Sequence, residues 1–282
     1  MSGVYALMDT LLPFEWLHYT FMKNALIAIV LLTPLFGMLG TMAVDNKMAF
    51  FSDAIGHSAF AGVAFGLLFA VSPNWTMPLL ALAVGLGIMA VKQRSSLSTD
   101  TIIGVFFSAV VAAGLAVVSR FPENVRDMQM FLYGDILTIG DADLCAIVIL
   151  FLVFLVFEFL SFNSLICIGL NQQLAKAHRI RIVLHQYLFA VLLSLVVIFS
   201  VKAVGVLLVT AMLITPAAAA RNLASSYGKM VWYALVIGIV CSISGLLLSA
   251  QDFLRTAAGA TIVLCSCAVF CISLLFRRHS RE

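Results

Sequence analysis

Charged residues are scarce in this sequence. Only 10% of the 282 residues are Asp, Glu, Lys or Arg, whereas 63% are hydrophobic and the mean hydropathy is +1.13. A water-soluble domain carries about a quarter charged residues, because its surface faces water. The scarcity excludes a soluble fold, and recurring apolar runs of about twenty residues indicate that lipid is the main solvent. The sequence therefore predicts an all-α integral membrane protein.

Other expected features are missing as well. No GxxxxGKS/T phosphate loop occurs, so this chain cannot bind ATP by that route, and no HExxH motif indicates a zinc protease. The first 19 residues lack the basic head and cleavage site of a signal peptide. The six cysteines lie almost entirely in apolar runs and indicate packing rather than a disulfide framework. Residues 1–282 are predicted to form a single transmembrane domain without a soluble part.

Nine apolar segments are each close to the length that a helix needs to cross the hydrocarbon. The weakest is 204–220, where Pro216 and an alanine run follow a short apolar stretch. It is predicted to be a span, or else a broken or re-entrant helix, which would leave eight spans. The nine segments are 22–42, 54–72, 76–92, 101–119, 142–161, 183–201, 204–220, 230–250 and 254–276.

Basic residues predict the orientation. If all nine segments cross the membrane, four basic clusters and the loop around Lys47 fall on the same side, which is then cytoplasmic. The N-terminus would lie outside and the C-terminus inside. The clusters are Lys92 and Arg94; Lys176, Arg179 and Arg181; Arg221 and Lys229; and Arg277, Arg278 and Arg281.

Two ionisable residues stand together at the head of the second segment. Asp53 and His57 are four residues apart, so on a helix they share one face, one turn apart. An ionisable group in hydrocarbon costs about 2.5–3.5 kcal/mol on insertion scales, so such groups usually face a polar pathway or a partner. A carboxylate with an imidazole suits Zn²⁺ or Mn²⁺ better than a soft Cu⁺. The surrounding small residues, including Gly62 and Gly66, would admit another helix or leave room for a lumen.

A structural interpretation of the same pair stays open. Asp53 lies near a helix start, where an acid caps amide groups and complements the helix dipole, and His57 could simply pair with it. The spacing alone does not decide between this role and metal transport.

The stretch "GMLGTMAVDNKMAFFSDAIGHSAFAGVAFG" (37–66) resembles the permease subunits of bacterial ABC importers for zinc, manganese and iron. Three further stretches resemble the same family in the same order, and together they cover about residues 20 to 276. Ser52 departs mildly from the glycine that is frequent at its position. The further stretches are "STDTIIGVFFSAVVAAGLAV" (98–117), "FLYGDILTI" (131–139) and "VGVLLVTAMLITPAAAARNLA" (204–224).

The resemblance implies a type II ABC importer-like helical fold in which Asp53 and His57 contact the metal in the translocation path. Asp100 and Asp135 are weaker pathway or gate residues by the same resemblance. Instead of a pathway role, Asp100 could cap a helix, because it lies in the sequence "SLSTDT", which is rich in capping residues. Asp135 could be an ordinary turn residue.

The polar loop 171–182 is the other informative stretch. The resemblance implies a coupling helix that docks on an ATPase subunit, whereas a positive-inside loop without a partner is the alternative. His178 and His185 are expected at a surface or interface and not as metal ligands. The expected coupling residues are Asn171, Gln172, Leu174, Ala175, Lys176, His178 and Arg179.

The resemblance also implies partners and a cargo. A second copy of the chain, a cytoplasmic ATPase pair and an extracytoplasmic metal-binding protein would complete an importer in the bacterial plasma (inner) membrane, without nucleic acid. The metal would be substrate and not a resident cofactor. Zinc is favoured, with manganese or iron as the alternative; a siderophore or cobalamin permease, a passive metal channel and a membrane enzyme are rival hypotheses.

Overall fold

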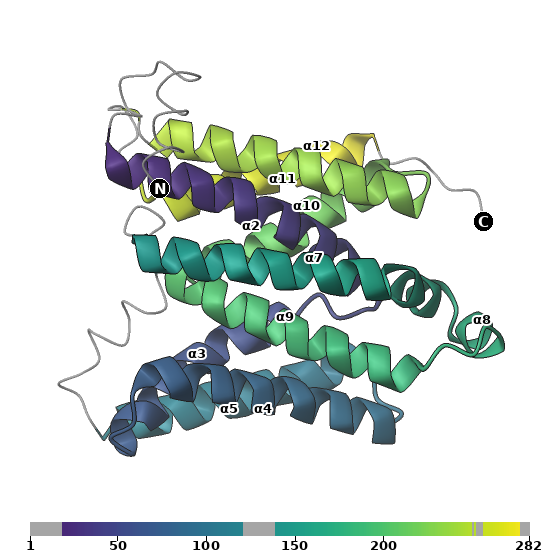
Figure 1. Cartoon of the computed structure of the whole chain (residues 1–282), viewed down its shortest axis with the longest axis horizontal. Coiled ribbons are helices and arrows are strands. Elements are labelled where there is room, and N and C mark those ends of the chain that lie inside the picture. The colour runs from purple at the N-terminus through teal and green to yellow at the C-terminus, as the bar shows by residue number, and fades with distance from the viewer. Residues whose placement is uncertain (1–18, 121–138, 250, 252–255, 277–282) are drawn as a thin grey trace.

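The computed structural model describes residues 19–120, 139–249, 251 and 256–276. Every regular element in these residues is α-helical (Figure 1). Nine of the described helices are long and apolar enough to cross a membrane, which confirms the predicted number, and α8 (Gln172–Ala177) is a short tenth. The nine are α2 (Thr20–Asp45), α3 (Phe51–Leu68), α4 (Pro73–Arg94), α5 (Thr99–Val118), α7 (Asp141–Leu170), α9 (Ile182–Val204), α10 (Val206–Leu223), α11 (Tyr227–Ser249) and α12 (Ala258–Leu275).

The helices form two packed groups with two helices between them. Helices α3, α4 and α5 lie at one edge, whereas α2, α10, α11 and α12 lie at the other (Figure 1). Helices α7 and α9 run between the groups, and α9 contacts α3 and α4 on one side and α7 and α10 on the other. Helix α3 also contacts α10, so it joins both groups. The position of α3 is therefore fixed from several directions.

Glycines allow the closest helix contacts. A Cβ atom at Gly62 of α3 would lie 2.7 Å from the Met77 Cα of α4, and a Cβ at Gly40 of α2 would overlap the Leu213 carbonyl oxygen of α10. Because hydrophobic burial does not drive helices together in lipid, such close packing holds them in place. The small-residue face at Gly62 therefore receives another helix and does not line a lumen.

Helix α10 corrects one expectation. A broken helix was one of the structures predicted for 204–220, and that prediction is wrong, because α10 is continuous from Val206 to Leu223 with Pro216 inside it. It is also long enough, at 18 residues, to count among the candidate spans. Pro216 removes one backbone hydrogen bond, but the helix continues on either side of it.

Helix α7 extends beyond its predicted segment. Hydropathy placed its end near residue 161, whereas the helix continues to Leu170 and has 30 residues. At 1.5 Å per residue it is about 45 Å long, compared with about 30 Å of hydrocarbon. Polar residues such as Asn163 lower the hydropathy of the last turns without ending the helix. The extra length carries α8 away from the apolar core.

A single residue, Gly205, connects α9 to α10. Its backbone has φ +86° and ψ 159°, a region that is essentially restricted to glycine.

We expect Gly205→Ala to lower the free energy of unfolding by about 1–3 kcal/mol, because alanine would be strained there. Thermal unfolding of the purified chain in detergent measures the effect. Gly228→Ala is the matched control, since a Cβ built at Gly228 meets nothing within 4 Å apart from its chain neighbours and the backbone of its own helix turn. Equal melting temperatures for the two variants would contradict the prediction.

Candidate functional site

The Asp53–His57 pair occupies the first two turns of α3. The helix begins at Phe51, so Asp53 is its third residue and His57 its seventh, one turn further on the same face. The His57 Nε2 atom lies 3.8 Å from Asp53 Oδ1, which is too far for a hydrogen bond. Each side chain is 37% exposed, so the pair presents one nitrogen and one carboxylate to an open face of the chain.

The start of α3 is not capped by Asp53. The N-cap residue is Phe50. Its hydrocarbon side chain cannot accept a hydrogen bond from a backbone amide, and no side-chain capping bond is found at this end. Asp53 still lies in the first turn, where its charge complements the helix dipole. Its carboxylate is thus oriented toward His57 without being used by the helix backbone.

Helices α5 and α10 flank the pair. The His57 ring contacts the ring of Phe107 from α5 edge to face, with 5.1 Å between the centroids. On the other side, Gly56 lies against α10, where an added Cβ would come within 2.9 Å of Val206 Cγ1 and 3.5 Å of Thr210 Cγ2. The aromatic contact restrains the imidazole, and the missing side chain at Gly56 lets α10 approach. The pair therefore lies on a face of α3 between two other helices.

The separation of the two donors is compatible with a shared metal ion. Two ligand atoms about 2.0–2.2 Å from a tetrahedral zinc are about 3.4 Å apart, slightly less than the 3.8 Å between Nε2 and Oδ1. A small side-chain rotation would close the difference. No group of three or more His, Cys, Asp or Glu able to hold a metal ion is found among the described residues. Asp53 and His57 are thus a sparse, two-ligand set.

The weaker pathway residues are placed differently. Asp100 is exposed in the first turn of α5, where its electrostatic partner is Lys92 of α4. The cap of α5 is Ser98, whose hydroxyl accepts the Thr101 amide at 3.1 Å, so Asp100 is not the capping residue itself. Asp135 lies outside the described residues. A role for either in the pathway remains a prediction.

Loops from several helices meet at one end of the bundle. A cavity of about 290 Å³ brings together the α2–α3 connection, the end of α4, the start of α5 and the junction between α7 and α8. Arg221 of α10 also interacts electrostatically with Asp45, which lines this cavity. Three of the four basic clusters, those that contain Lys92, Lys176 and Arg221, therefore lie at the same end as the loop of Lys47. The distribution of basic residues in the sequence predicted this arrangement. The cluster Arg277, Arg278 and Arg281 lies outside the described residues.

Helix α8 lies at the same end (Figure 1). Asn171 caps it, and its side-chain oxygen accepts the amides of Gln173 at 2.8 Å and Leu174 at 3.3 Å. Ala175 alone is buried against the bundle. The remaining expected coupling residues are exposed, namely Asn171, Gln172, Leu174, Lys176, His178 and Arg179. The stretch expected to be a coupling loop or helix thus contains a short capped helix, and all of its expected coupling residues except Ala175 are exposed.

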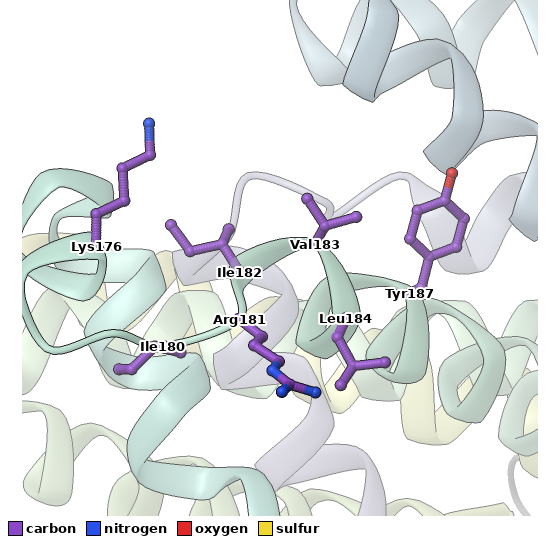
Figure 2. Close-up of a pocket in the computed structure, with 7 residues that line it drawn as sticks. All are labelled: Lys176, Ile180, Arg181, Ile182, Val183, Leu184 and Tyr187. Atoms are coloured by element: carbon purple, nitrogen blue, oxygen red, sulfur yellow. The ribbon is translucent and has the colours of Figure 1, made fainter.

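An apolar cavity of about 620 Å³ adjoins α8 at the start of α9. Its lining combines aliphatic side chains with two basic ones. In Figure 2, Lys176 and Tyr187 point to one side of this segment, whereas Arg181 and Leu184 point to the other. The lining residues are Lys176, Ile180, Arg181, Ile182, Val183, Leu184 and Tyr187.

Two features of the chain were missed from the sequence. Phe107 gave no signal, because a phenylalanine in an apolar run is ordinary until a neighbour is known. Glu158, buried in the middle of α7, did have a signal, since an acid within a predicted membrane helix is itself unusual.

Known proteins resemble this chain over nearly its whole length. The ABC 3 transport family matches residues 18–277. A zinc uptake system membrane protein of Haemophilus influenzae, ZnuB, is 34% identical over 256 residues, which cover 90% of this chain and 97% of the relative. A manganese transport system membrane protein of Listeria monocytogenes, MntC, is 31% identical over 260 residues, 92% of each chain.

A solved structure shows the same fold. It is described as PsaBC from Streptococcus pneumoniae in complex with Fab, and its matching chain superposes with a TM-score of 0.78 and 28% identity. The match covers 100% of this chain and 98% of the other. With nine candidate spans in its described residues and metal transport permeases among its relatives, the chain is a multi-pass protein of the bacterial inner membrane. It belongs to the ABC 3 transport family and is a metal ABC permease.

Proposed function

We propose that this chain is the permease of an ATP-driven importer that moves a divalent transition metal, with zinc as the favoured cargo, into the cytoplasm. Asp53 and His57 contact the ion during passage. The observation that carries the proposal is the pair itself, a carboxylate and an imidazole 3.8 Å apart on a partly exposed face of α3. Two protein ligands bind an ion without a full protein shell, and so allow its release on the other side.

A second copy of the chain would complete the pathway. Two ionisable side chains, each 37% exposed, would be unfavourable against lipid tails. Phe60 continues the partly exposed stripe one turn beyond His57. A twofold partner packed over this stripe would exclude lipid and leave the metal-binding side chains in a conduit between two copies. Water or the partner would supply the remaining ligands.

ATP hydrolysis would come from separate cytoplasmic subunits, and α8 would dock on them. A direct contact leads from α8 toward the metal-binding pair. At Gly169, near the end of α7 and just before α8, a Cβ would overlap the Asp45 carboxylate at the end of α2, so the two helix ends are in direct contact at this point. Residues 46–50 then connect Asp45 to α3. A displacement of α8 would therefore push the helix end that leads into the site, and an extracytoplasmic binding protein would deliver the metal.

Zinc is favoured over manganese because the stretch "DAIGHSAFAG" (53–62) resembles the zinc-type members of the family more than the manganese-type members. The two donors do not discriminate, since a carboxylate with an imidazole suits both ions. Relatives named for zinc and for manganese are similar at nearly equal identity, so the choice depends on measurement.

Replacing either ligand should strongly reduce metal-dependent activity. We expect Asp53→Ala and His57→Ala each to lower metal-stimulated ATP turnover and uptake at least about tenfold, equal to about 1.4 kcal/mol. The assay uses proteoliposomes with the permease, its ATPase and its binding protein. In the wild type, half-maximal stimulation should need less Zn²⁺ than Mn²⁺.

Ser58→Ala is the matched control. Ser58 neighbours His57, but its hydroxyl is buried and donates to the Ile55 carbonyl at 2.6 Å, so transport should stay within about twofold. Unchanged uptake in both ligand variants would refute the assignment of the site and favour a bulky chelated cargo. Metal flux without the ATPase would instead favour a passive channel.

The docking role of α8 gives a separate test. Leu174 is 48% exposed, and Leu174→Glu should reduce copurification of the ATPase at least about tenfold by placing a charge in an apolar contact. Leu97→Glu makes the same change at a leucine that is 57% exposed in the connection between α4 and α5, and it should have little effect. Equal retention of the ATPase by both variants would show that α8 does not dock.

A further inference from the structure

The His57 ring has few contacts that could fix its orientation. Its Nε2 atom is 3.8 Å from Asp53 Oδ1, too far for a hydrogen bond, and the hydrogen bonds found within the described residues include none to His57. A metal-binding histidine usually donates its other ring N–H to a carboxylate or a backbone carbonyl, and that bond sets the ring orientation. In the described part of this chain, the orientation of the ring depends on another kind of contact.

The ring of Phe107 supplies this contact. It meets the His57 ring edge to face, with 5.1 Å between the centroids and 86° between the planes. Aromatic pairs favour this arrangement because the positive edge of one ring lies against the negative face of the other. The χ2 torsion that rotates an imidazole has broad minima and restricts the ring only weakly. The Phe107 contact therefore favours one orientation of the His57 ring.

Packing of α5 on α3 holds Phe107 in this position. Ile103, Phe107 and Gly114 are spaced by four and seven residues, so they share one face of α5. Ile103 is buried, and a Cβ at Gly114 would lie 3.0 Å from Phe60 Cδ1 and 3.1 Å from Ala61 Cα of α3. The helix is thus held one turn before and two turns after Phe107.

The neighbouring Phe106 lies on a different face of α5. Successive residues of a helix point about 100° apart, and a Cβ at Gly87 of α4 would lie 2.8 Å from Phe106 Cε1. Phe106 therefore packs toward α4, whereas Phe107 contacts the His57 ring. Because both rings are partly buried against the apolar core, Phe106 is a matched control for the loss of an aromatic side chain from α5.

The orientation of the ring affects how well His57 can bind an ion together with Asp53. An imidazole binds a metal through a nitrogen lone pair that lies in the plane of the ring, so rotation of the ring redirects that lone pair. No third His, Cys, Asp or Glu completes a metal-binding group with the pair in the described residues. A two-ligand site of this kind depends strongly on the orientation of each ligand.

We propose that Phe107 is a positioning residue of the metal site, whose ring holds the His57 imidazole in the orientation that binds the ion together with Asp53. This inference rests on the proposed role of Asp53 and His57 in metal passage. Phe107 acts through His57 and is not itself a ligand, because its hydrocarbon side chain has no donor atom.

Nuclear magnetic resonance of the lipid-reconstituted full chain, without metal or ATPase, tests the contact. The five histidines are labelled with ¹³C and ¹⁵N, and the His57 signals are those that disappear in His57→Gln. Phe107→Leu should shift the His57 ring signals, because it removes the ring current of the neighbouring aromatic ring. Phe106→Leu should leave them in place. Unchanged His57 signals in Phe107→Leu, or equal shifts in the two leucine variants, would overturn the proposal.

Zinc titration of the same samples tests the positioning role. Phe107→Leu should weaken Zn²⁺ binding at least about threefold, as expected for the loss of one aromatic contact. Phe106→Leu should bind within about twofold of the wild type, and Phe107→Tyr, which keeps the ring, should do the same. A loss of affinity that Phe106→Leu shares, or that Phe107→Tyr does not restore, would indicate general packing and contradict the proposal.

Failure of the metal site itself would give a different result. If His57→Gln bound Zn²⁺ as tightly as the wild type, the proposed role of His57 would be refuted, and this inference with it. A loss of affinity in His57→Gln together with wild-type affinity in Phe107→Leu would refute the positioning role alone.

Discussion

A polar side chain inside a membrane protein must be hydrogen-bonded, covered by protein or kept neutral, and this constraint explains the placement of the few ionisable groups here. Most of the described lysines and arginines gather at one end, whereas Lys23, Arg120 and Lys202 lie at the opposite ends of their helices. Asp53 and His57 remain partly exposed on the face of α3, where lipid tails would be an unfavourable neighbour. Glu158 lies inside the bundle, and its carboxyl oxygens have no hydrogen-bond partner among the described residues.

Glycine contacts determine how precisely the site is held. Gly62 brings α4 against the backbone of α3, and Gly56 brings α10 close beside His57. Because such contacts leave little free space, α3 cannot move without its neighbours. The same kind of contact at Gly169 joins the approach to α8 with the end of α2. A rigid connection of this kind is what an ATP-driven permease would need to transmit motion from a docking helix to a metal site.

Sequence reasoning succeeded where one physical rule decides the outcome. Hydropathy predicted nine spans, the helical period placed Asp53 and His57 on one face, and basic residues predicted which loops share an end. It failed where tertiary packing decides. Helix α10 is continuous through Pro216, which is buried in the packed bundle, and the contact of Phe107 with His57 joins residues fifty positions apart. The last turns of α7 were missed because polar residues such as Asn163 lower their hydropathy without ending the helix.

X-ray absorption spectroscopy of zinc bound to the reconstituted permease tests the central claim most directly, since it identifies the atoms around the metal. The account predicts a first shell of nitrogen and oxygen at about 2.0–2.2 Å that includes an imidazole. The imidazole signal should disappear in His57→Gln while the oxygen shell remains. An imidazole signal that persists in His57→Gln, or a shell dominated by sulfur at about 2.3 Å, would contradict the assignment of Asp53 and His57 as the residues that meet the ion.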